Sequence, residues 1–308
     1  MTNQSDTANG LTKQEIIDGL HEIGLKQGDV VLIHTAMRTF GHIDGGAGTV
    51  MDAFLEVLGP HGTLVAPAFT FCHEAEEHPI IDPRQDRSEM GAITEAVRQH
   101  PEARRSTAYR HSFSAIGRRA RVITEVDPAL SSFDLRSSFG VMLALDTQVV
   151  LCGMTYQSST SHHFAEMVCD VSYRQTIPLT VKVRQADDSL TDQPMTDYQP
   201  RSEGGSYYGS RHPDFIRLGQ MMEERGVVGK AFIGNAAVRR FPMRELVDLA
   251  EAEAAVDENI FCAPEGQEGT SALTFGTKTQ SPEMIDGAGR TVRFEWCVRD
   301  VDKLVLPQ

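Results

Sequence analysis

The sequence predicts an α/β fold with a mixed, largely parallel central sheet flanked by helices. In the first half, buried-strand patterns alternate with amphipathic helical patterns, an order typical of parallel sheets whose crossovers are helices. In the second half, two pairs of strand patterns are separated by short turn sequences, which predicts hairpins and therefore antiparallel strands as well. With 308 residues, 40% hydrophobic and 23% charged, the chain is ordinary for a globular protein with a sizeable core.

The amino-terminal half opens with a helix. Thr12 followed by Glu15, ahead of an apolar periodic run, is a capping box. The apolar segment "DVVLIHT" then predicts a buried strand that ends at His34. The remaining elements of this half are expected as a glycine-rich loop at 41–48, a helix at 50–58, a strand at 62–71, a helix near 89–100 and a strand at 111–117.

The second half mixes helices with hairpins. "DTQVVLCG" predicts a strand, and a helix is expected to begin near Thr160. "LTVKVRQADDSLT" predicts a hairpin that turns at "ADDS", and "GKAFIGNAAVRRF" predicts another around Gly234 and Asn235. The other expected elements are a helix from Pro213 to Gly226, a helix at 242–256, and a turn at Asp286 and Gly287 leading into "RTVRFEWCVRDV".

One domain accounts for most of the chain. We expect residues 1–10 to be a disordered tail, 11–265 a single α/β domain, and 266–308 a β-rich carboxyl-terminal extension packed on it. Two long irregular stretches, "DPRQDRSEM" (82–90) and "DYQPRSEGGSYYGSRHP" (197–213), interrupt this domain. Long loops in compact domains are often functional, so both are expected to border a site.

Charge and targeting signals limit the function classes. The formal net charge of −14 disfavours nucleic acid and anionic membranes as partners and favours small cationic molecules. No apolar run approaches the roughly 20 residues of a membrane span, and no secretory signal pattern is present, so the cytoplasm is the expected compartment. Five scattered cysteines without CxxC spacing indicate neither a disulfide framework nor a zinc-finger site.

One segment differs from the acidic background. Residues 103–124 contain six arginines and no acidic residue. Such a segment is either a solvated basic face or a local seat for an anionic ligand.

The stretch "SSTSHHFAEM" carries the strongest candidate chemistry. It follows the "DTQVVLCG" strand, where ligands usually bind in open α/β sheets. On a helix, His163 and Glu166 share one face, and a carboxylate beside an imidazole supports a general base. The same spacing also occurs on solvated helices, so the pair alone leaves a structural role open. No metal site is expected, because two candidate ligands without an HExxH pattern are too few.

Common cofactor and nucleophile signatures are missing. The sequence lacks a complete GxGxxG, a GxxxxGK[ST], a GxSxG elbow and the acyl-CoA signature of the common acetyltransferases.

Four ordered motifs resemble the aminoglycoside 3-N-acetyltransferase family. "VVLIHTAMRTFGHIDGGAGTVMDAFLEVLGPHGTLVAPAFTF" resembles its His-Ser-Ser loop, Gly-rich turn and Gly-Thr-Leu strand, and "EMGAITEAVR" its Met-Gly-x-x-x-Glu helix. "RRSTAYRHSFSAIG" resembles its Arg-Ser-x-His-Pro-x-x-Ser segment, and "SSTSHHFAE" its Asn-Thr-x-x-His-x-x-Glu motif. The matches span roughly residues 10 to 180, and the rest is looser but compatible.

The resemblance implies a family fold distinct from that of the common acetyltransferases, an N-acyltransferase activity, and acetyl-CoA or coenzyme A as acyl donor, without a metal. It implies His163 as general base, Glu166 as its support, and a hydroxyl or N–H from Thr160 or Thr35 on the thioester oxyanion. It also gives the arginine-rich segment the task of seating phosphates. The positions it assigns to the cofactor are His34, Thr35, Ala36, Arg38, Arg105, Ser106, Ser112 and Phe113.

Several family positions differ in this chain. Ala36 replaces a motif serine, Ala108 and Tyr109 replace the histidine and proline, and Ser159 replaces the asparagine. The expected function is acetyl transfer to a small cationic amine, with an aminoglycoside as the leading acceptor and a homodimer left open. The alternatives are an amide or ester hydrolase using the same His–Glu pair and a ligand-binding relative without turnover.

Overall fold

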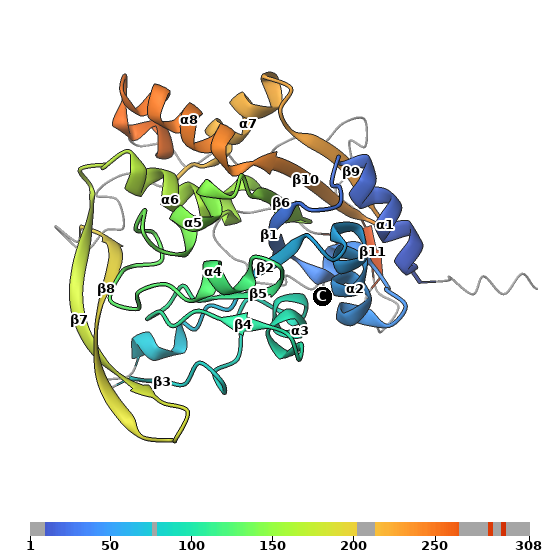
Figure 1. Cartoon of the computed structure of the whole chain (residues 1–308). Helices are drawn as coiled ribbons and strands as arrows, with labels where there is room; N and C mark the ends of the chain where they lie inside the picture. The colour runs from blue at the N-terminus through green and yellow to red at the C-terminus, as the bar shows by residue number, and fades with distance from the viewer. Residues whose placement is uncertain (1–9, 76–78, 202–212, 265–282, 286–290, 294–308) are drawn as a thin grey trace, which may run out of the picture.

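A computed structural model describes residues 10–75, 79–201, 213–264, 283–285 and 291–293 (Figure 1). Most described strands form a seven-stranded sheet in the order β4-β5-β2-β1-β6-β10-β9. Their bounds are β1 Val30–Thr35, β2 Thr63–Pro67, β4 Arg104–Arg105, β5 Phe113–Gly117, β6 Gln148–Cys152, β9 Gly229–Ile233 and β10 Ala236–Pro242.

The central sheet confirms the predicted mixed α/β class, with a smaller parallel part than expected. Only β2, β1 and β6 run parallel, through two of the six strand pairings, and the outer pairings are antiparallel. The predicted 229–241 hairpin is the physical reason on one side, since β9 and β10 turn at Gly234 and Asn235 and β10 pairs with β6 antiparallel.

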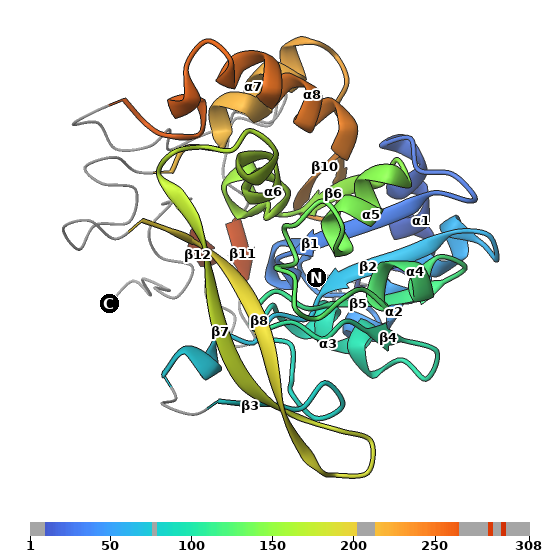
Figure 2. The same cartoon turned by 60° about the vertical axis from the view of Figure 1, so that its left-hand side comes forward.

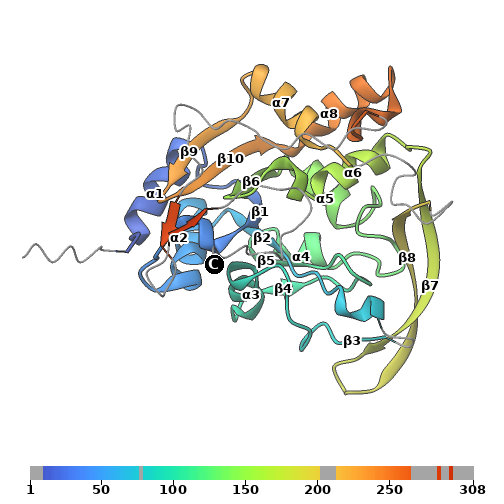
Figure 3. The same cartoon turned by 180° about the vertical axis from the view of Figure 1, so that it is seen from behind.

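Two apolar cores lie on opposite faces of this sheet, because successive strand side chains alternate between faces. Val31 and Ile33 pack with helices α1, α2 and α3, whereas Val30 and Leu32 pack with α4, α5, α6, α7 and α8. Figures 1 and 3 show the sheet between these helical layers. The bounds are α1 Lys13–Glu22, α2 Gly46–Leu58, α3 Ala92–Gln99, α4 Ala120–Thr124, α5 Ser138–Ala144, α6 Ser161–Val168, α7 Ile216–Glu224 and α8 Met243–Ala254.

Local signals placed most helix ends well. The capping box is present: Glu15 N–H donates to Thr12 Oγ1 at 3.3 Å, and Thr12 N–H donates to Glu15 Oε2 at 2.8 Å. The helix expected near 89–100 begins later, at Ala92, because Gly91 has a φ of +108°, outside the helical region.

Short 3-10 turns join several elements. They are η1 Met37–Phe40, η2 Cys72–Ala75, η3 Tyr156–Ser158 and η4 Glu258–Phe261. In the described part of the chain, no helix is long and apolar enough to cross a membrane.

A long hairpin stands beside the central sheet (Figure 2). Strands β7 (Arg174–Arg184) and β8 (Leu190–Pro200) pair antiparallel over their full length, which confirms the predicted hairpin, and β3 (Ile80–Ile81) joins β7 parallel. The hairpin matters for function because its base, at Arg174 and Tyr198, reaches helix α6.

The carboxyl-terminal extension is described only in part. Strands β11 (Glu283–Ile285) and β12 (Thr291–Arg293) pair antiparallel. The predicted turn at Asp286 and Gly287, and the predicted tail at residues 1–9, lie outside the described residues. The division into a domain and an extension stays a prediction.

Two helical glycines give opposite predictions for stability. A Cβ at Gly219 of α7 would lie 2.0 Å from the ring of Tyr156, which is fully buried and donates to Glu223 at 3.1 Å. Gly219→Ala is therefore expected to lower the free energy of unfolding by ~1–3 kcal/mol through overpacking. Nothing lies within 4 Å of a Cβ at Gly48 of α2, so Gly48→Ala is expected to raise it by up to ~1 kcal/mol. Urea denaturation measures both, and equal effects would contradict the packing argument.

Candidate active site

The candidate site lies where β1 and β6 end at the same edge of the sheet. These strands are parallel neighbours, with His34 opposite Leu151 and Thr35 opposite Cys152. The chain leaves β6 through Gly153, whose φ is +67° and where a Cβ would lie 1.7 Å from Thr39 Oγ1. Glycine is required there, and it directs the chain toward α6.

The start of the "SSTSHHFAEM" segment reaches back to β1. Thr160, just before α6, places Oγ1 3.4 Å from Nε2 of His34. Two predicted site residues 126 positions apart therefore meet. Burial lowers the pKa of His34 to about 4, so its imidazole is neutral near pH 7.

His163 and Glu166 form the predicted pair on α6. His163 Nδ1 lies 2.7 Å from Glu166 Oε2; the Glu166 side chain is fully buried, and the His163 side chain is 25% exposed. A contact this short between a carboxylate oxygen and a ring nitrogen requires a proton between them. Nδ1 therefore carries the hydrogen, and Nε2 is the nitrogen able to accept a proton.

Two further residues hold the Glu166 carboxylate. Tyr173 Oη donates to Oε1 at 3.1 Å, and Arg174 Nη1 donates to Oε2 at 3.0 Å. Arg174 Nη1 also lies 3.1 Å from His163 Nδ1. Because arginine only donates and Nδ1 already carries hydrogen, its productive bond is the one to Glu166. Sequence reasoning missed both residues, because the predicted hairpin began only at Leu179, whereas β7 begins at Arg174 in the structure.

Aromatic rings enclose the imidazole of His163. The Phe215 ring lies edge-on with its centroid 4.8 Å away, and the Phe133 ring lies at 6.2 Å. Burial lowers the pKa of His163, Arg174 lowers it further, and Glu166 opposes both. The net direction is downward, so the imidazole is a neutral base near pH 7.

The other histidine of the motif, His162, faces another direction. His162 is fully buried and stacks on Phe215 with ring centroids 5.0 Å apart. Burial lowers its pKa to about 3, and neither ring nitrogen has a hydrogen-bond partner among the described residues. His162 is a neutral packing residue behind the site.

The loop after β1 contributes a buried turn and one exposed cation. Ala36 N–H donates to Cys152 O at 2.9 Å, and Ala36 O accepts from Thr39 Oγ1 at 2.7 Å. Thr35 is buried, whereas Arg38 in η1 is exposed. Arg38 is therefore placed where it can meet an anion in solution.

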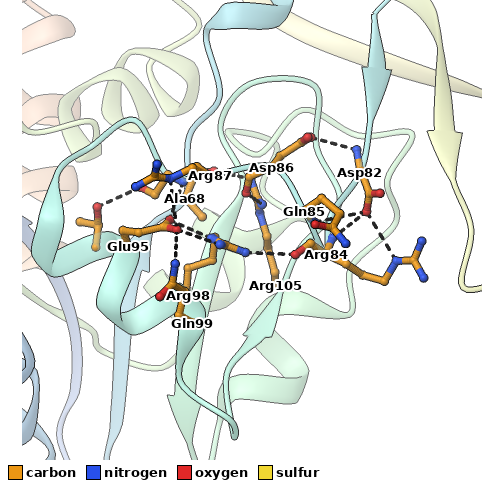
Figure 4. Close-up of polar contacts among 12 residues, drawn as sticks. Ala68, Asp82, Arg84, Gln85, Asp86, Arg87, Glu95, Arg98, Gln99 and Arg105 are labelled. Atoms are coloured by element: carbon orange, nitrogen blue, oxygen red, sulfur yellow. Dashed lines mark hydrogen bonds and ion pairs between the residues drawn. The ribbon is translucent and has the colours of Figure 1, made fainter.

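Of the other four predicted cofactor positions, Arg105 holds the 82–90 loop (Figure 4). Arg105 donates to Ala68 O at 2.6 Å, to Ser112 Oγ at 3.1 Å and to the carbonyls of Pro83 and Asp86. Ser112 Oγ donates to Ala68 O at 2.7 Å. These contacts fix the irregular loop against β2 and β5.

Ser106 and Phe113 are equally internal. Ser106 Oγ accepts the N–H of Phe113 at 2.9 Å. The Phe113 ring is fully buried and packs edge-on against Phe69 and Phe139. As cofactor positions, these residues stay predictions.

Arginines of the 103–124 segment form separate ion pairs within the chain, some exposed and one buried. Arg104 and Arg121 both pair with Glu125, at 3.0 and 2.7 Å. Arg110 forms a buried ion pair with Asp197 of β8. In this structure the segment mainly joins elements of the fold, which differs from the single anion seat considered from sequence.

Two open hollows lie on the described surface, and neither is lined by His163 or Glu166. One of about 520 Å³ is lined by the middle of the β7–β8 hairpin and Ala129. The other, of about 360 Å³, is lined by Asp134, Leu135, Arg136 and Met167. Within the described ranges, no cluster of three His, Cys, Asp or Glu residues could hold a metal ion.

Comparisons with known proteins identify the class. The family model for aminoglycoside 3-N-acetyltransferase matches residues 32–254, well over half of the chain. Aminoglycoside N(3)-acetyltransferase VII of Streptomyces paromomycinus is 27% identical over 264 residues, covering 79% of this chain and 91% of its own length. These matches define an N-acyltransferase, as expected from the sequence. The chain belongs to the aminoglycoside 3-N-acetyltransferase family.

Solved structures share the fold. The aminoglycoside acetyltransferase AAC(3)-Xa aligns with a TM-score of 0.71 at 26% identity, covering 82% of this chain and 94% of its own. The binary structure of AAC-IIIb with CoASH aligns with a TM-score of 0.71 at 20% identity, covering 83% and 100%. The predicted family fold is confirmed.

Neighbouring arginines should differ sharply in stability effect. Arg105 is bonded to several internal carbonyls, whereas Arg104 is more than half exposed in its pair with Glu125. Arg105→Ala is expected to lower the free energy of unfolding by ~2–4 kcal/mol, because it removes hydrogen bonds to the buried carbonyl of Ala68 and to the part-buried carbonyls of Pro83 and Asp86. Arg104→Ala should cost less than ~1 kcal/mol. Chemical denaturation compares them, and a tolerated Arg105→Ala would refute the anchoring role.

Proposed function

We propose that the protein transfers the acetyl group of acetyl-CoA to an amine of a small cationic substrate, with an aminoglycoside as the leading acceptor class. His163 is the general base and Glu166 its support. The proposal rests on the 2.7 Å contact between His163 Nδ1 and the fully buried Glu166 carboxylate. This pair lies beside the carboxyl ends of β1 and β6, in a chain that belongs to the family. This contact leaves Nε2 as the proton acceptor.

The proposed reaction moves one proton and one acetyl group. As the amine nitrogen bonds to the thioester carbonyl carbon, His163 Nε2 takes the proton that the nitrogen loses. The buried Glu166 carboxylate stabilises the resulting imidazolium. The C–S bond then breaks, and the departing thiolate takes the proton from His163, so the base returns neutral and the products are an amide and a thiol.

Two other residues, Thr160 and Arg38, have proposed supporting tasks. Thr160, whose hydroxyl lies 3.4 Å from His34 Nε2, is the proposed donor to the developing thioester oxyanion. The use of coenzyme A is supported by the family and by the structural neighbour described with CoASH. Arg38 is the proposed phosphate contact, because it is exposed while Arg105 is bonded within the fold.

The acceptor class follows from the relatives and from charge. The family and the Streptomyces paromomycinus relative are named for aminoglycosides. Aminoglycosides are polycations, and a net charge of −14 favours their approach.

Replacing His163 tests the base directly. We expect His163→Ala to lower kcat with acetyl-CoA and an aminoglycoside by ~10²–10⁴-fold, because the proton acceptor is removed. The matched control is His61→Ala, since His61 is exposed in the turn before β2, at the opposite edge of the sheet. Undiminished turnover by a folded His163→Ala variant would sink the mechanism. Thiol release that does not need the amine would indicate hydrolysis instead.

Arg38 should affect binding of the donor more than chemistry. Arg38→Ala is expected to raise KM for acetyl-CoA by ~10-fold, the loss expected for one charge-assisted phosphate contact, with kcat little changed. KM for the amine should stay within about twofold, which provides the internal control. An unchanged KM for acetyl-CoA would remove Arg38 from the donor site.

A further inference from the structure

Arg174, the first residue of β7, contacts both members of the His163–Glu166 pair. Its side chain is 5% exposed. Nη1 lies 3.0 Å from Glu166 Oε2 and 3.1 Å from His163 Nδ1. Nη2 donates to the carbonyl of Tyr198 at 3.2 Å, and the guanidinium carbon lies 4.5 Å from the centroid of the Tyr198 ring. The cation is thus held between α6 and both strands of the hairpin.

A buried carboxylate needs such a partner. A fully buried anion is strongly destabilised unless it is paired and hydrogen-bonded, and otherwise takes up a proton. Glu166 accepts from Tyr173 on Oε1 and from Arg174 and His163 on Oε2. Arginine stays protonated and has no acceptor atom, so Arg174 cannot remove the proton from His163 Nδ1.

Arg174 also limits how readily His163 becomes charged. Glu166 favours the imidazolium, whereas the nearby cation and the enclosing rings disfavour it. Among the described residues, the other titratable or charged groups facing His163 are Arg110, which is paired with Asp197 of β8, and the histidines His111 and His162, whose pKa values are lowered by burial. Arg174 is the cation in contact with the pair itself.

We propose that Arg174 is a positioning residue that holds the Glu166 carboxylate aligned on His163 Nδ1 and disfavours a second proton on the His163 imidazole at neutral pH. The inference rests on the proposed role of His163 as base. The outer part of the β7–β8 hairpin is remote from α6, but Arg174 at its base contacts His163 and Glu166. The hairpin therefore supplies the positive charge that controls proton binding by His163.

The experiment removes the charge and then restores it. Arg174→Met and Arg174→Gln are neutral, and Arg174→Lys keeps the cation. The matched control is Arg239→Met, because Arg239 of β10 is also buried, pairs with Glu223 at 3.0 Å and lies over a tyrosine ring, that of Tyr156. Two readouts are used: the pH profile of kcat/KM for acetyl transfer, and ¹⁵N-histidine NMR titration of His163 without substrate.

In both neutral variants the pair should take up its proton at higher pH. We expect the acid limb of kcat/KM and the NMR midpoint of His163 to rise by ~1–2 pH units, the usual effect of losing a close charge. Arg174→Lys and Arg239→Met should leave both midpoints near the wild-type values. If Arg174→Met fails to fold, Arg174→Gln carries the same expectation.

Two results would overturn the inference: unmoved midpoints in a folded neutral variant, or an equal rise in Arg174→Lys. The NMR midpoint needs no turnover, so the two proposals fail separately. Absence of acetyl transfer by the wild-type protein refutes the proposed function, whereas an unmoved His163 titration refutes the role of Arg174.

Discussion

The buried carboxylate of Glu166 is the constraint on which the candidate site depends. It is fully removed from water, yet it accepts from Tyr173, Arg174 and His163, which come from one helix and the start of the neighbouring hairpin. Breaking a buried pair by removing one partner typically costs ~3–5 kcal/mol, far more than the pair contributes when intact. The same contacts that stabilise the junction of α6 and β7 therefore also orient the imidazole.

The sheet brings the rest of the site to that junction. Because β1 and β6 are parallel, their carboxyl ends share one edge, and Thr160 meets His34 across it. Gly153 has no Cβ to clash with Thr39, so the chain can leave β6 at this point. Aromatic rings, above all Phe215, shield most of the His163 imidazole from water. A neutral base and its supporting carboxylate therefore lie within one turn of α6.

Charge serves two distinct tasks in this protein. The net charge of −14 produces a long-range field suited to cationic ligands. The arginines act locally: Arg105 anchors the 82–90 loop through backbone carbonyls, Arg110 ties β8 to the segment before β5, and Arg174 pairs with Glu166. A cluster that is contiguous in sequence, 103–124, is thereby dispersed in space, because strand and turn geometry point successive side chains to different neighbours.

Local patterns in the sequence determined the elements and the central pair. The capping box at Thr12, the two hairpins and the i,i+3 spacing of His163 and Glu166 all depend on residues a few positions apart, so periodicity suffices to predict them. Tertiary structure alone decided that Arg105 faces inward and that Arg174 reaches Glu166. It also decided how much of the sheet is parallel. These outcomes depend on chain crossings and burial, which bring distant residues together and which no local spacing encodes.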